Sequence, residues 1–175
     1  LMTRPSTHAH SAVRADLALG LAQASGPAGM VGGQVLDIAS EKTVARALHS
    51  LDGVTSIQRM KTGALIRFAA EAGAILAQAT PRQREALRDY GEALGAAFQI
   101  ADDLLDAEGD SAATGKAVGK DAAAGKATFV TVLGIDGARA RLRDLSAAAR
   151  AALAPFGDAA SDLAGAIDFV ANRRG

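Results

Sequence analysis

Three aspartates at helical spacing are the side chains of this sequence best suited to chemistry. Asp102 and Asp106 are four residues apart and share one face of a predicted helix, and Asp103 lies about 100° round from them. Three carboxylates with no nearby His or Cys suit a hard cation such as Mg²⁺, bound together with phosphate oxygens. An acidic helix end that only meets solvent explains the same residues, so this pattern alone leaves both interpretations open.

A lysine-rich segment follows the aspartates. The chain has five lysines, and three of them lie close together, each directly after a glycine: Lys116, Lys120 and Lys126. Flexible backbone beside point charges is suited to holding phosphate oxygens. The acidic cluster and the basic segment therefore predict a metal-bridged diphosphate site, and lysines that merely neutralise the aspartates are the alternative. A fourth lysine, Lys61, lies in the middle of a predicted helix and by itself indicates only a surface residue.

The composition predicts that helices position these charges. The 175 residues include 43 alanines, five phenylalanines, one tyrosine and no tryptophan. This mixture favours closely packed helices over sheets, which are rich in aromatic and β-branched residues. The predicted fold class is therefore all-α.

Charge and hydropathy exclude several classes of function. Nineteen Lys and Arg balance 19 Asp and Glu, so the net charge indicates neither a nucleic-acid nor a membrane-surface partner. The absence of cysteine excludes disulfides, thiolate metal sites and a Cys nucleophile, and it fits a reducing compartment. No apolar run approaches the roughly 20 residues that span a bilayer. These features predict a soluble, cytoplasmic protein with no membrane span.

Helix signals divide the chain into a short lead-in and one domain. Residues 1–12 show no period and predict a disordered lead-in, and residues 13–175 predict a single domain. Helices are expected at about 13–24, 28–39, 51–78, 81–107, 127–134, 137–154 and 158–171. The residues predicted to cap helix N-termini are Ser50, Thr80 with Gln83, and Asp136. A long polar loop is expected at 108–126, and loops of this length are often functional.

The helix predicted at about 28–39 carries glycines and two polar residues in an apolar stretch. Gly29, Gly32 and Gly33 each cost about 1 kcal/mol relative to alanine, which suggests the close approach of another backbone or of a ligand. Gln34 and Asp37 either point into a cavity or form hydrogen bonds with a neighbouring helix.

Taken together, these elements resemble a known enzyme family. The chain contains, in order, Gly32-Gly33-Gln34-x-x-Asp37, Lys61-Thr62-Gly63, Phe98-Gln99-x-x-Asp102-Asp103-x-x-Asp106, Gly115-Lys116 and Gly125-Lys126. Their order and separations strongly resemble those of the trans-isoprenyl (polyprenyl) diphosphate synthases, and the aspartates look like that family's second aspartate-rich motif. The residues around Lys61 are most similar to those of the bacterial farnesyl diphosphate synthases.

The resemblance implies a fold, a cofactor and partners. The fold would be the isoprenoid-synthase helical bundle, usually a homodimer, around an apolar cavity with the aspartates at its mouth. The cofactor would be Mg²⁺, and the substrates would be an allylic diphosphate and isopentenyl diphosphate.

The resemblance also implies roles for individual residues. Asp102 would bind Mg²⁺ directly, and Asp103 and Asp106 would act through ordered waters or neighbouring hydrogen bonds. The residues implied to bind the allylic diphosphate are Lys61, Thr62, Gln99, Lys116, Lys126 and Gln34, and those implied to be catalytic are Lys61, Asp102 and Lys116. The loop that closes over the site would be ordered by Lys120 and Asp121, and the isopentenyl diphosphate would be approached by Arg173 and Arg174.

The implied function is prenyl transfer that makes a short-chain product, farnesyl diphosphate. The allylic diphosphate would ionise, the double bond of isopentenyl diphosphate would attack the carbocation, and a proton would be lost. Catalysis would stabilise a leaving group electrostatically and would need no protein nucleophile. None of the Ser, His or Asp residues has the sequence context of a nucleophilic triad.

The sequence departs from the family in one respect. Family members also carry a first aspartate-rich motif and upstream positions for isopentenyl diphosphate, and this chain has no other DDxxD. We therefore expect the 175 residues to be the C-terminal part of a synthase, with an incomplete fold and no activity alone. A non-catalytic subunit or paralogue of the same fold that pairs with a complete synthase is the alternative. A terpene cyclase fits less well, because the Lys-Thr-Gly and Gly-Lys elements resemble those of chain elongation.

Overall fold

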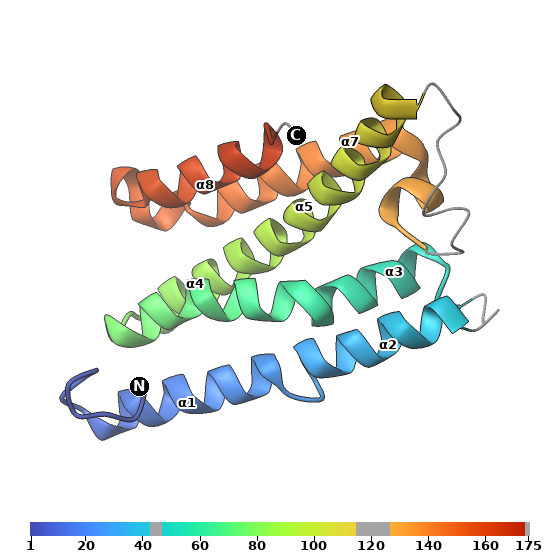
Figure 1. Ribbon diagram of the computed structural model, residues 1–175. Helices are drawn as coiled ribbons and strands as arrows, with labels where there is room; N and C mark the ends of the chain where they lie inside the picture. Colours follow the sequence, from blue (N-terminus) through green and yellow to red (C-terminus); the bar gives the residue numbers. More distant parts are fainter. Residues whose placement is uncertain (43–46, 115–126, 174–175) are drawn as a thin grey trace.

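Helices form all the regular secondary structure in the part of the chain that the structure describes. The structure is a computed structural model, and it describes residues 1–42, 47–114 and 127–173. Every element in these ranges is an α-, π- or 3₁₀-helix, which confirms the all-α prediction (Figure 1). No helix in the same ranges is both long enough and apolar enough to cross a membrane.

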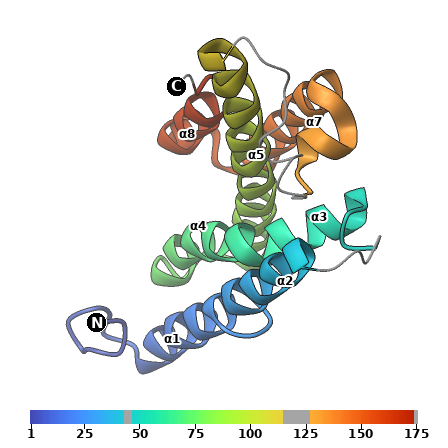
Figure 2. The ribbon, with the colours of Figure 1, turned by 45° about the vertical axis from the view of Figure 1, so that its right-hand side comes forward.

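The helices pack in successive layers. In chain order they are α1 (Ser11–Ser25), α2 (Met30–Lys42), α3 (Leu51–Gln58), the π-helix η1 (Arg59–Gly63), α4 (Ala64–Leu76), α5 (Pro81–Thr114), α7 (Phe129–Ala152), the 3₁₀-helix η2 (Ala154–Ala160) and α8 (Ser161–Ala171). Helices α1 and α2 follow one another nearly end to end, and the rod formed by α3, η1 and α4 lies beside them (Figure 1). The long helix α5 crosses this rod and packs on its other side against α7 and α8, as the turned view in Figure 2 shows.

Apolar clusters join these layers. Leu17 of α1, 2% exposed, packs with Phe68 of α4, and Ile100 of α5, fully buried, packs in a cluster with Ala138 of α7. Tyr90, in a third cluster, is buried between α5 and α8, and its hydroxyl donates a hydrogen bond of 2.9 Å to the Leu163 carbonyl. Helix α5 therefore contributes to the clusters on the α7 and α8 side. These contacts hold α5 in place, and with it the aspartate-rich run.

Two of the predicted N-caps are confirmed. The Ser50 hydroxyl accepts a hydrogen bond of 3.1 Å from the Gly53 amide at the start of α3. At the start of α5, the Gln83 amide donates to the Thr80 hydroxyl at 3.3 Å, and the Thr80 amide donates to Gln83 Oε1 at 3.1 Å. This reciprocal pair is the predicted capping box.

Two predicted boundaries are wrong, and a third is confirmed. The helix expected over 51–78 is interrupted by the π-helix η1, whose wider turn shifts the apolar pattern by about one residue. Residues 108–114 are helical and not part of a loop, because an existing helix gains one hydrogen bond per added residue and Glu108 pairs with Arg139 of α7 at 2.8 Å. The break expected between helices at 127–134 and 137–154 is confirmed, because Gly134 inside α7 has non-helical backbone angles (φ 71°, ψ 167°). Thr128 caps the start of α7, and the cap at Asp136 stays a prediction.

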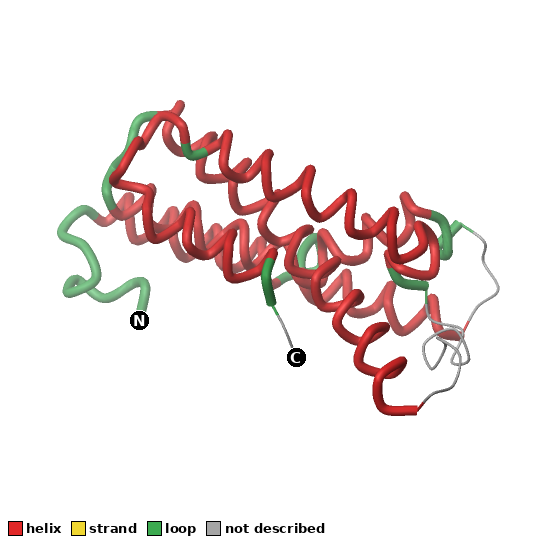
Figure 3. Tube along the Cα trace, turned by 90° about the horizontal axis from the view of Figure 1, so that it is seen from above, coloured by secondary structure: helices red, strands yellow, loops and turns green. Residues whose placement is uncertain are grey.

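Residues 1–10 form turns ahead of α1 (Figure 3). The Thr7 hydroxyl donates to the Leu1 carbonyl at 2.7 Å, and Arg14 of α1 donates to the His8 and Ala9 carbonyls. The expected disorder of residues 1–12 stays a prediction. Figure 3 also shows that the described connections between helices are short compared with the helices themselves.

A group of ion pairs ties α4 to α5. The Glu71 carboxylate, with 15% of its side chain exposed, accepts hydrogen bonds from Arg88 at 2.6 and 3.3 Å and from Arg84 at 3.2 Å. The bond from Arg88 is the main cause that lowers the pKa of Glu71 below its ordinary value of 4.5, against a smaller opposing effect of burial. The carboxylate form of Glu71 therefore stabilises the folded state.

Replacing Glu71 by glutamine is expected to lower the free energy of unfolding by about 1 kcal/mol at neutral pH. Because the pKa is lower in the folded state than in the unfolded chain, the stabilisation is complete above about pH 4.5 and is lost as the pH falls through the folded-state pKa. Urea unfolding of wild type and Glu71→Gln should thus differ at pH 7, and the difference should shrink as the pH falls through the folded-state pKa of Glu71. Glu85→Gln, an exposed acid on α5, is the control, and a Glu71→Gln difference independent of pH would contradict this account.

Candidate active site

A buried carboxylate holds the lysine of the Lys61-Thr62-Gly63 motif. Lys61 lies on η1, and its Nζ is 2.5 Å from Asp37 Oδ2 of α2. Asp37 is 5% exposed, whereas 28% of the Lys61 side chain remains exposed. The ammonium group is therefore fixed from the protein side and still reachable by a ligand. Of the two interpretations of Asp37, the hydrogen bond to a neighbouring helix is confirmed.

Gly33 allows α2 to approach η1 this closely. A Cβ atom built at Gly33 would lie 2.2 Å from the Lys61 backbone nitrogen, far inside any allowed contact. On the opposite side, a Cβ at Gly95 of α5 would lie 3.0 Å from Gly63 Cα. The predicted close approach of another backbone is confirmed, and at Gly33 that backbone is η1, whereas a Cβ at Gly29 or Gly32 would meet the carbonyl of Ala24 or Pro27. Gln34, also on α2, is exposed.

A chain of hydrogen bonds connects η1, α5 and α7. The Thr62 hydroxyl donates to Gln99 Oε1 at 3.4 Å, and Gln99 Nε2 donates to Asp103 Oδ1 at 3.0 Å. The backbone N–H of Phe129, the first residue of α7, donates to Asp103 Oδ2 at 2.9 Å. Two motifs that are far apart in the sequence, Lys61-Thr62-Gly63 and the aspartate-rich run, are thus physically joined.

A C-terminal arginine contacts the aspartate-rich run. Arg173 Nη1 lies 3.0 Å from Asp102 Oδ1, and its guanidinium lies 5.3 Å from the centre of the Phe98 ring. Phe98 and Asp102 are one turn apart on α5, so one arginine meets both. The sequence argument assigned neutralisation of the aspartates to the lysines, and it did not predict this contact of Arg173 with Asp102.

The aspartates do not lie at the end of their helix. Because α5 continues to Thr114, Asp102 and Asp106 are more than two turns before its C-terminus, where the helix dipole no longer acts strongly on them. The prediction that the helix ends at about residue 107, directly after the aspartates, is therefore wrong. Asp102 keeps 40% of its side chain exposed, and Asp106 is exposed one turn further along.

The described residues do not by themselves complete a metal site. Within 1–42, 47–114 and 127–173, no group of three His, Cys, Asp or Glu side chains is arranged to hold an ion. Several predicted site residues lie outside the described residues: Lys116, Lys120, Asp121, Lys126 and Arg174.

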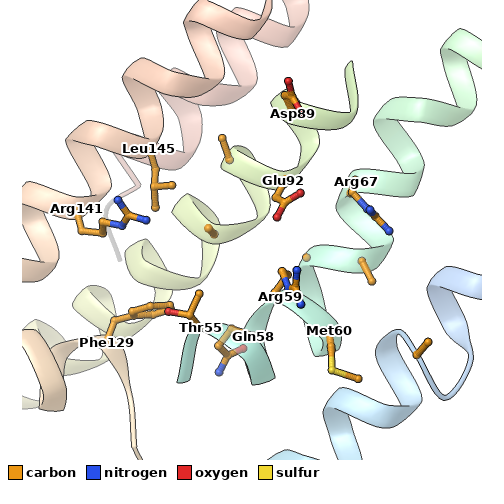
Figure 4. Close-up of a pocket in the computed structure, with 15 residues that line it drawn as sticks. Thr55, Gln58, Arg59, Met60, Arg67, Asp89, Glu92, Phe129, Arg141 and Leu145 are labelled. Atoms are coloured by element: carbon orange, nitrogen blue, oxygen red, sulfur yellow. The ribbon is translucent and has the colours of Figure 1, made fainter. Parts of the chain in front are cut away.

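A separate pocket lies between η1, α4, α5 and α7 (Figure 4). Its volume is about 450 Å³, and Gly63, Ala93 and Ala96 are among the small residues that line it. Gln58, 7% exposed, also lines it, and among the described residues its Oε1 is a buried oxygen with no hydrogen-bond partner. None of the residues predicted to bind substrate or metal lines this pocket. The candidate active site is therefore not this pocket. It is the group of charged and polar residues described above, which extends from Asp37 and Lys61 to Asp102.

The chain was compared with known proteins. Residues 14–154 match the family model "Polyprenyl synthetase". The farnesyl diphosphate synthase of Escherichia coli (strain K12) is 44% identical over 144 residues, which cover 81% of this chain and 46% of that protein. The farnesyl diphosphate synthase of Geobacillus stearothermophilus is 41% identical over 131 residues, or 74% of this chain and 42% of that protein. The chain thus spans less than half the length of these relatives.

Solved structures also match this chain over nearly all of its length and over about half of theirs. The FPP/GFPP synthase from Zymomonas mobilis, solved without ligand, is 39% identical and superposes with a TM-score of 0.85 over 97% of this chain and 55% of that one. A geranyltransferase from Helicobacter pylori, solved with magnesium and isoprenyl diphosphate, is 26% identical, with a TM-score of 0.71 over 93% of this chain and 52% of that one.

Proposed function

This chain belongs to the polyprenyl synthetase family, and from that premise we propose that it supplies the second aspartate-rich motif of a prenyltransferase. The proposed reaction condenses an allylic diphosphate with isopentenyl diphosphate to give a short-chain product, farnesyl diphosphate. The sequence identity to farnesyl diphosphate synthases supports the choice of product. The absence of cysteine is compatible with the proposed cytoplasmic location.

One observation carries the proposal. A cation, Lys61, and a carboxylate, Asp102, lie on different helices, η1 and α5. The two helices are joined by the hydrogen bond from Thr62, the neighbour of Lys61, to Gln99 of α5, and Gln99 in turn donates to Asp103, the neighbour of Asp102. A leaving diphosphate needs positive charge fixed in advance on one side and a metal-binding carboxylate on the other. The Lys61 motif provides the positive charge, and the aspartate-rich run provides the carboxylate.

The donor set fits Mg²⁺. Asp102 and Asp106 offer carboxylate oxygens on one face of α5, and such oxygens are the protein ligands that Mg²⁺ prefers. Mg²⁺ at phosphate-transfer sites is usually held by one or two carboxylates plus substrate phosphates, and Asp102 and Asp106 would supply the carboxylates here. The magnesium and isoprenyl diphosphate bound to the Helicobacter pylori relative support the same choice. When bound, the ion would draw charge from the departing diphosphate.

The protein residues then have defined tasks. The allylic C–O bond breaks with its electron pair passing to the diphosphate, and Lys61, fixed by Asp37, stabilises the charge that develops there. The double bond of isopentenyl diphosphate forms the new C–C bond, and loss of a proton restores neutrality at carbon. Arg173, which contacts Asp102 at 3.0 Å, would give up part of this contact if Asp102 held the cation.

The test is a prenyl-transfer assay of the intact protein. Geranyl diphosphate, labelled isopentenyl diphosphate and Mg²⁺ should give farnesyl diphosphate, identified by mass spectrometry, and chelation should abolish the product. A cyclic hydrocarbon as product would contradict the proposal.

The 175-residue chain is proposed to be inactive by itself, and turnover by the purified chain would contradict this. A chain that is inactive yet raises the rate of an added complete synthase would favour the alternative, a non-catalytic subunit.

An exposed apolar stripe on α2 supports the proposed homodimer. Val31, Val35 and Ile38 are spaced to lie on one face of α2, and they are 48%, 61% and 43% exposed. The face of α2 that carries Gly33 and Asp37 packs on η1, so the stripe lies away from that contact. A second copy would bury such a stripe from water.

Glutamate at Val35 is therefore expected to weaken dimerisation by about 100-fold or more, because it places a charge at the centre of the buried stripe. Analytical ultracentrifugation of the intact protein measures the change. Leu76→Glu, at another exposed apolar position on α4, is the control and should leave the dimer intact. Equal dimer affinity for Val35→Glu and wild type would place the interface elsewhere.

A further inference from the structure

The pocket between η1, α4, α5 and α7 is separate from the candidate active site and has its own chemistry (Figure 4). Its volume of about 450 Å³ lies in the range of pockets that hold small organic molecules. Its apolar walls include Gly63, Ala93 and Ala96, whose small size leaves the space open, and the larger Phe129 and Leu145. These walls can accept the ring or the hydrocarbon part of a ligand.

The Gln58 amide is a polar group in this lining that the protein leaves incompletely satisfied. Gln58 is 7% exposed, and its Oε1 is a buried oxygen to which no described residue donates a hydrogen bond. A buried acceptor without a partner costs free energy, which a donor recovers. The terminal amide turns easily, because the torsion next to it has broad minima, so Oε1 can meet a donor in the pocket. Gln58 therefore favours a ligand that carries an N–H or O–H group.

The charged lining of the pocket consists of three arginines and two carboxylates: Arg59, Arg67, Arg141, Asp89 and Glu92. Arg67 is half-buried, and within the described residues none of the three arginines takes part in an ion pair. A guanidinium that is withdrawn from water without a carboxylate partner favours a bound anion, and it binds phosphate through two parallel hydrogen bonds. Since the lining holds one more cation than carboxylate, one phosphate group suits it better than a diphosphate.

The π-helix η1 brings two of these arginines to the same face of the rod. Arg59 and Arg67 are eight residues apart, which in a regular α-helix would place them about 80° from one another. The wide turn of η1 takes up one more residue than an α-helical turn, so it removes most of this offset. Figure 4 shows Arg59 between Gln58 and Arg67, with Glu92 of α5 on the facing side. A ligand that lies along the rod therefore meets an amide at one end and guanidinium groups at the other.

We propose that this pocket binds a nucleoside monophosphate. The edge of a base presents an N–H donor beside a ring nitrogen, and these two groups match the acceptor and the donor of the Gln58 amide. The ring lies against Phe129, and the ribose hydroxyls donate to Glu92. The phosphate accepts hydrogen bonds from Arg59 and Arg67. No residue assigned to prenyl transfer lines the pocket, so this proposal stands apart from the proposed function.

A prenyl diphosphate matches the same lining less well. Its hydrocarbon chain carries no donor, so it leaves Gln58 Oε1 without a partner. It also brings a second phosphate group to a pocket in which Asp89 and Glu92 already offset two of the three arginines. Competition between the two ligands therefore tests what the pocket recognises.

The first measurement is isothermal titration calorimetry of the intact protein without metal or prenyl substrate. AMP is expected to bind once per chain. Adenosine and ribose 5-phosphate, each of which lacks one end of the ligand, should bind at least about tenfold more weakly. No binding at about 5 mM AMP would overturn the proposal. Equal affinity of AMP and ribose 5-phosphate, or displacement of AMP by geranyl diphosphate, would overturn it too.

Two substitutions then test whether the ligand lies in this pocket. Gln58→Leu is expected to weaken AMP binding by about tenfold or more, while ribose 5-phosphate binding stays within about twofold. Arg67→Gln is expected to weaken AMP binding by about tenfold or more, while adenosine binding stays within about twofold. Arg82→Gln, at an exposed arginine of α5 outside the pocket, is the matched control and should bind AMP like wild type. Wild-type AMP affinity in both pocket variants would overturn the proposal.

Thermal unfolding of the variants separates lost binding from lost folding. Gln58→Leu removes a buried oxygen that has no partner, so it should unfold no earlier than wild type. If Arg67→Gln does not fold, Arg59→Gln, at an exposed position beside Gln58, carries the same expectation. The comparison of AMP, adenosine and ribose 5-phosphate on wild type needs no variant and decides the chemical class of the ligand by itself.

Discussion

Alanine at Asp102 is expected to lower the rate of prenyl transfer by the intact protein by about 100- to 1,000-fold, which is the cost of removing one fixed group that stabilises a leaving anion. The reason lies in the surroundings of Asp102. Its side chain is 40% exposed, and the cation beside it, Arg173, is itself 33% exposed, so a ligand can reach the pair. A steady-state assay with saturating substrates and varied Mg²⁺ measures the loss.

The control for Asp102→Ala lies on the same helix. Glu85→Ala also removes an exposed carboxylate from α5, but more than four turns away from the aspartate-rich run, and its rate should stay within about twofold of wild type. A near wild-type rate for Asp102→Ala would contradict the assignment of this residue. Thermal unfolding of both variants shows whether a loss of rate reflects a loss of fold.

Local signals in the sequence predicted much of the fold. The capping signals at Ser50 and at Thr80 with Gln83 act through atoms two or three residues away, so their meaning does not depend on the rest of the chain. The all-α class followed from composition for a similar reason, since alanine favours helix at every position. These are the features that the structure confirms.

Features that depend on distant contacts were not predicted. The π-helix η1 has no side-chain cap, and the shift of about one residue that its wider turn adds to the apolar pattern is smaller than one helical turn, so the sequence signals one continuous helix. The extension of α5 to Thr114 is accompanied by the pairing of Glu108 with Arg139, which lies on another helix. Sequence spacing alone predicts neither the π-helix nor the pairing of Glu108 with Arg139.

The same distinction applies to the candidate site. The motifs identified the residue types and their order, and the structure brings Lys61, Thr62, Gln99 and Asp103 into contacts that join three helices. Spacing along one helix could not reveal that Asp102 contacts a partly exposed arginine and that Asp103, its neighbour in the chain, contacts a helix N-terminus. What each aspartate can bind depends on those partners.

Alanine at Gly33 is expected to cost about 1–3 kcal/mol of stability and to lower the rate by at least about tenfold in the molecules that still fold. The added Cβ would lie 2.2 Å from the Lys61 nitrogen and 2.6 Å from Lys61 Cα. These are backbone atoms of η1, so no side chain can rotate to make room. Helix α2 and η1 must separate instead, and the 2.5 Å contact between Asp37 and Lys61 lengthens with them.

Gly73 provides a control of opposite sign. It lies in α4, is exposed, and has no atom within 4 Å of an added Cβ, so Gly73→Ala should raise the free energy of unfolding by about 0.5–1 kcal/mol through the better helix propensity of alanine. Urea unfolding and the prenyl-transfer rate measured on both variants test the pair. If Gly33→Ala were as stable as Gly73→Ala, the contact between α2 and η1 would not be what fixes Lys61. The two substitutions add the same atom to a helix and differ only in what that atom contacts. Loss of rate in Gly33→Ala with an unchanged rate in Gly73→Ala would therefore show that catalysis depends on the distance between the backbones of α2 and η1.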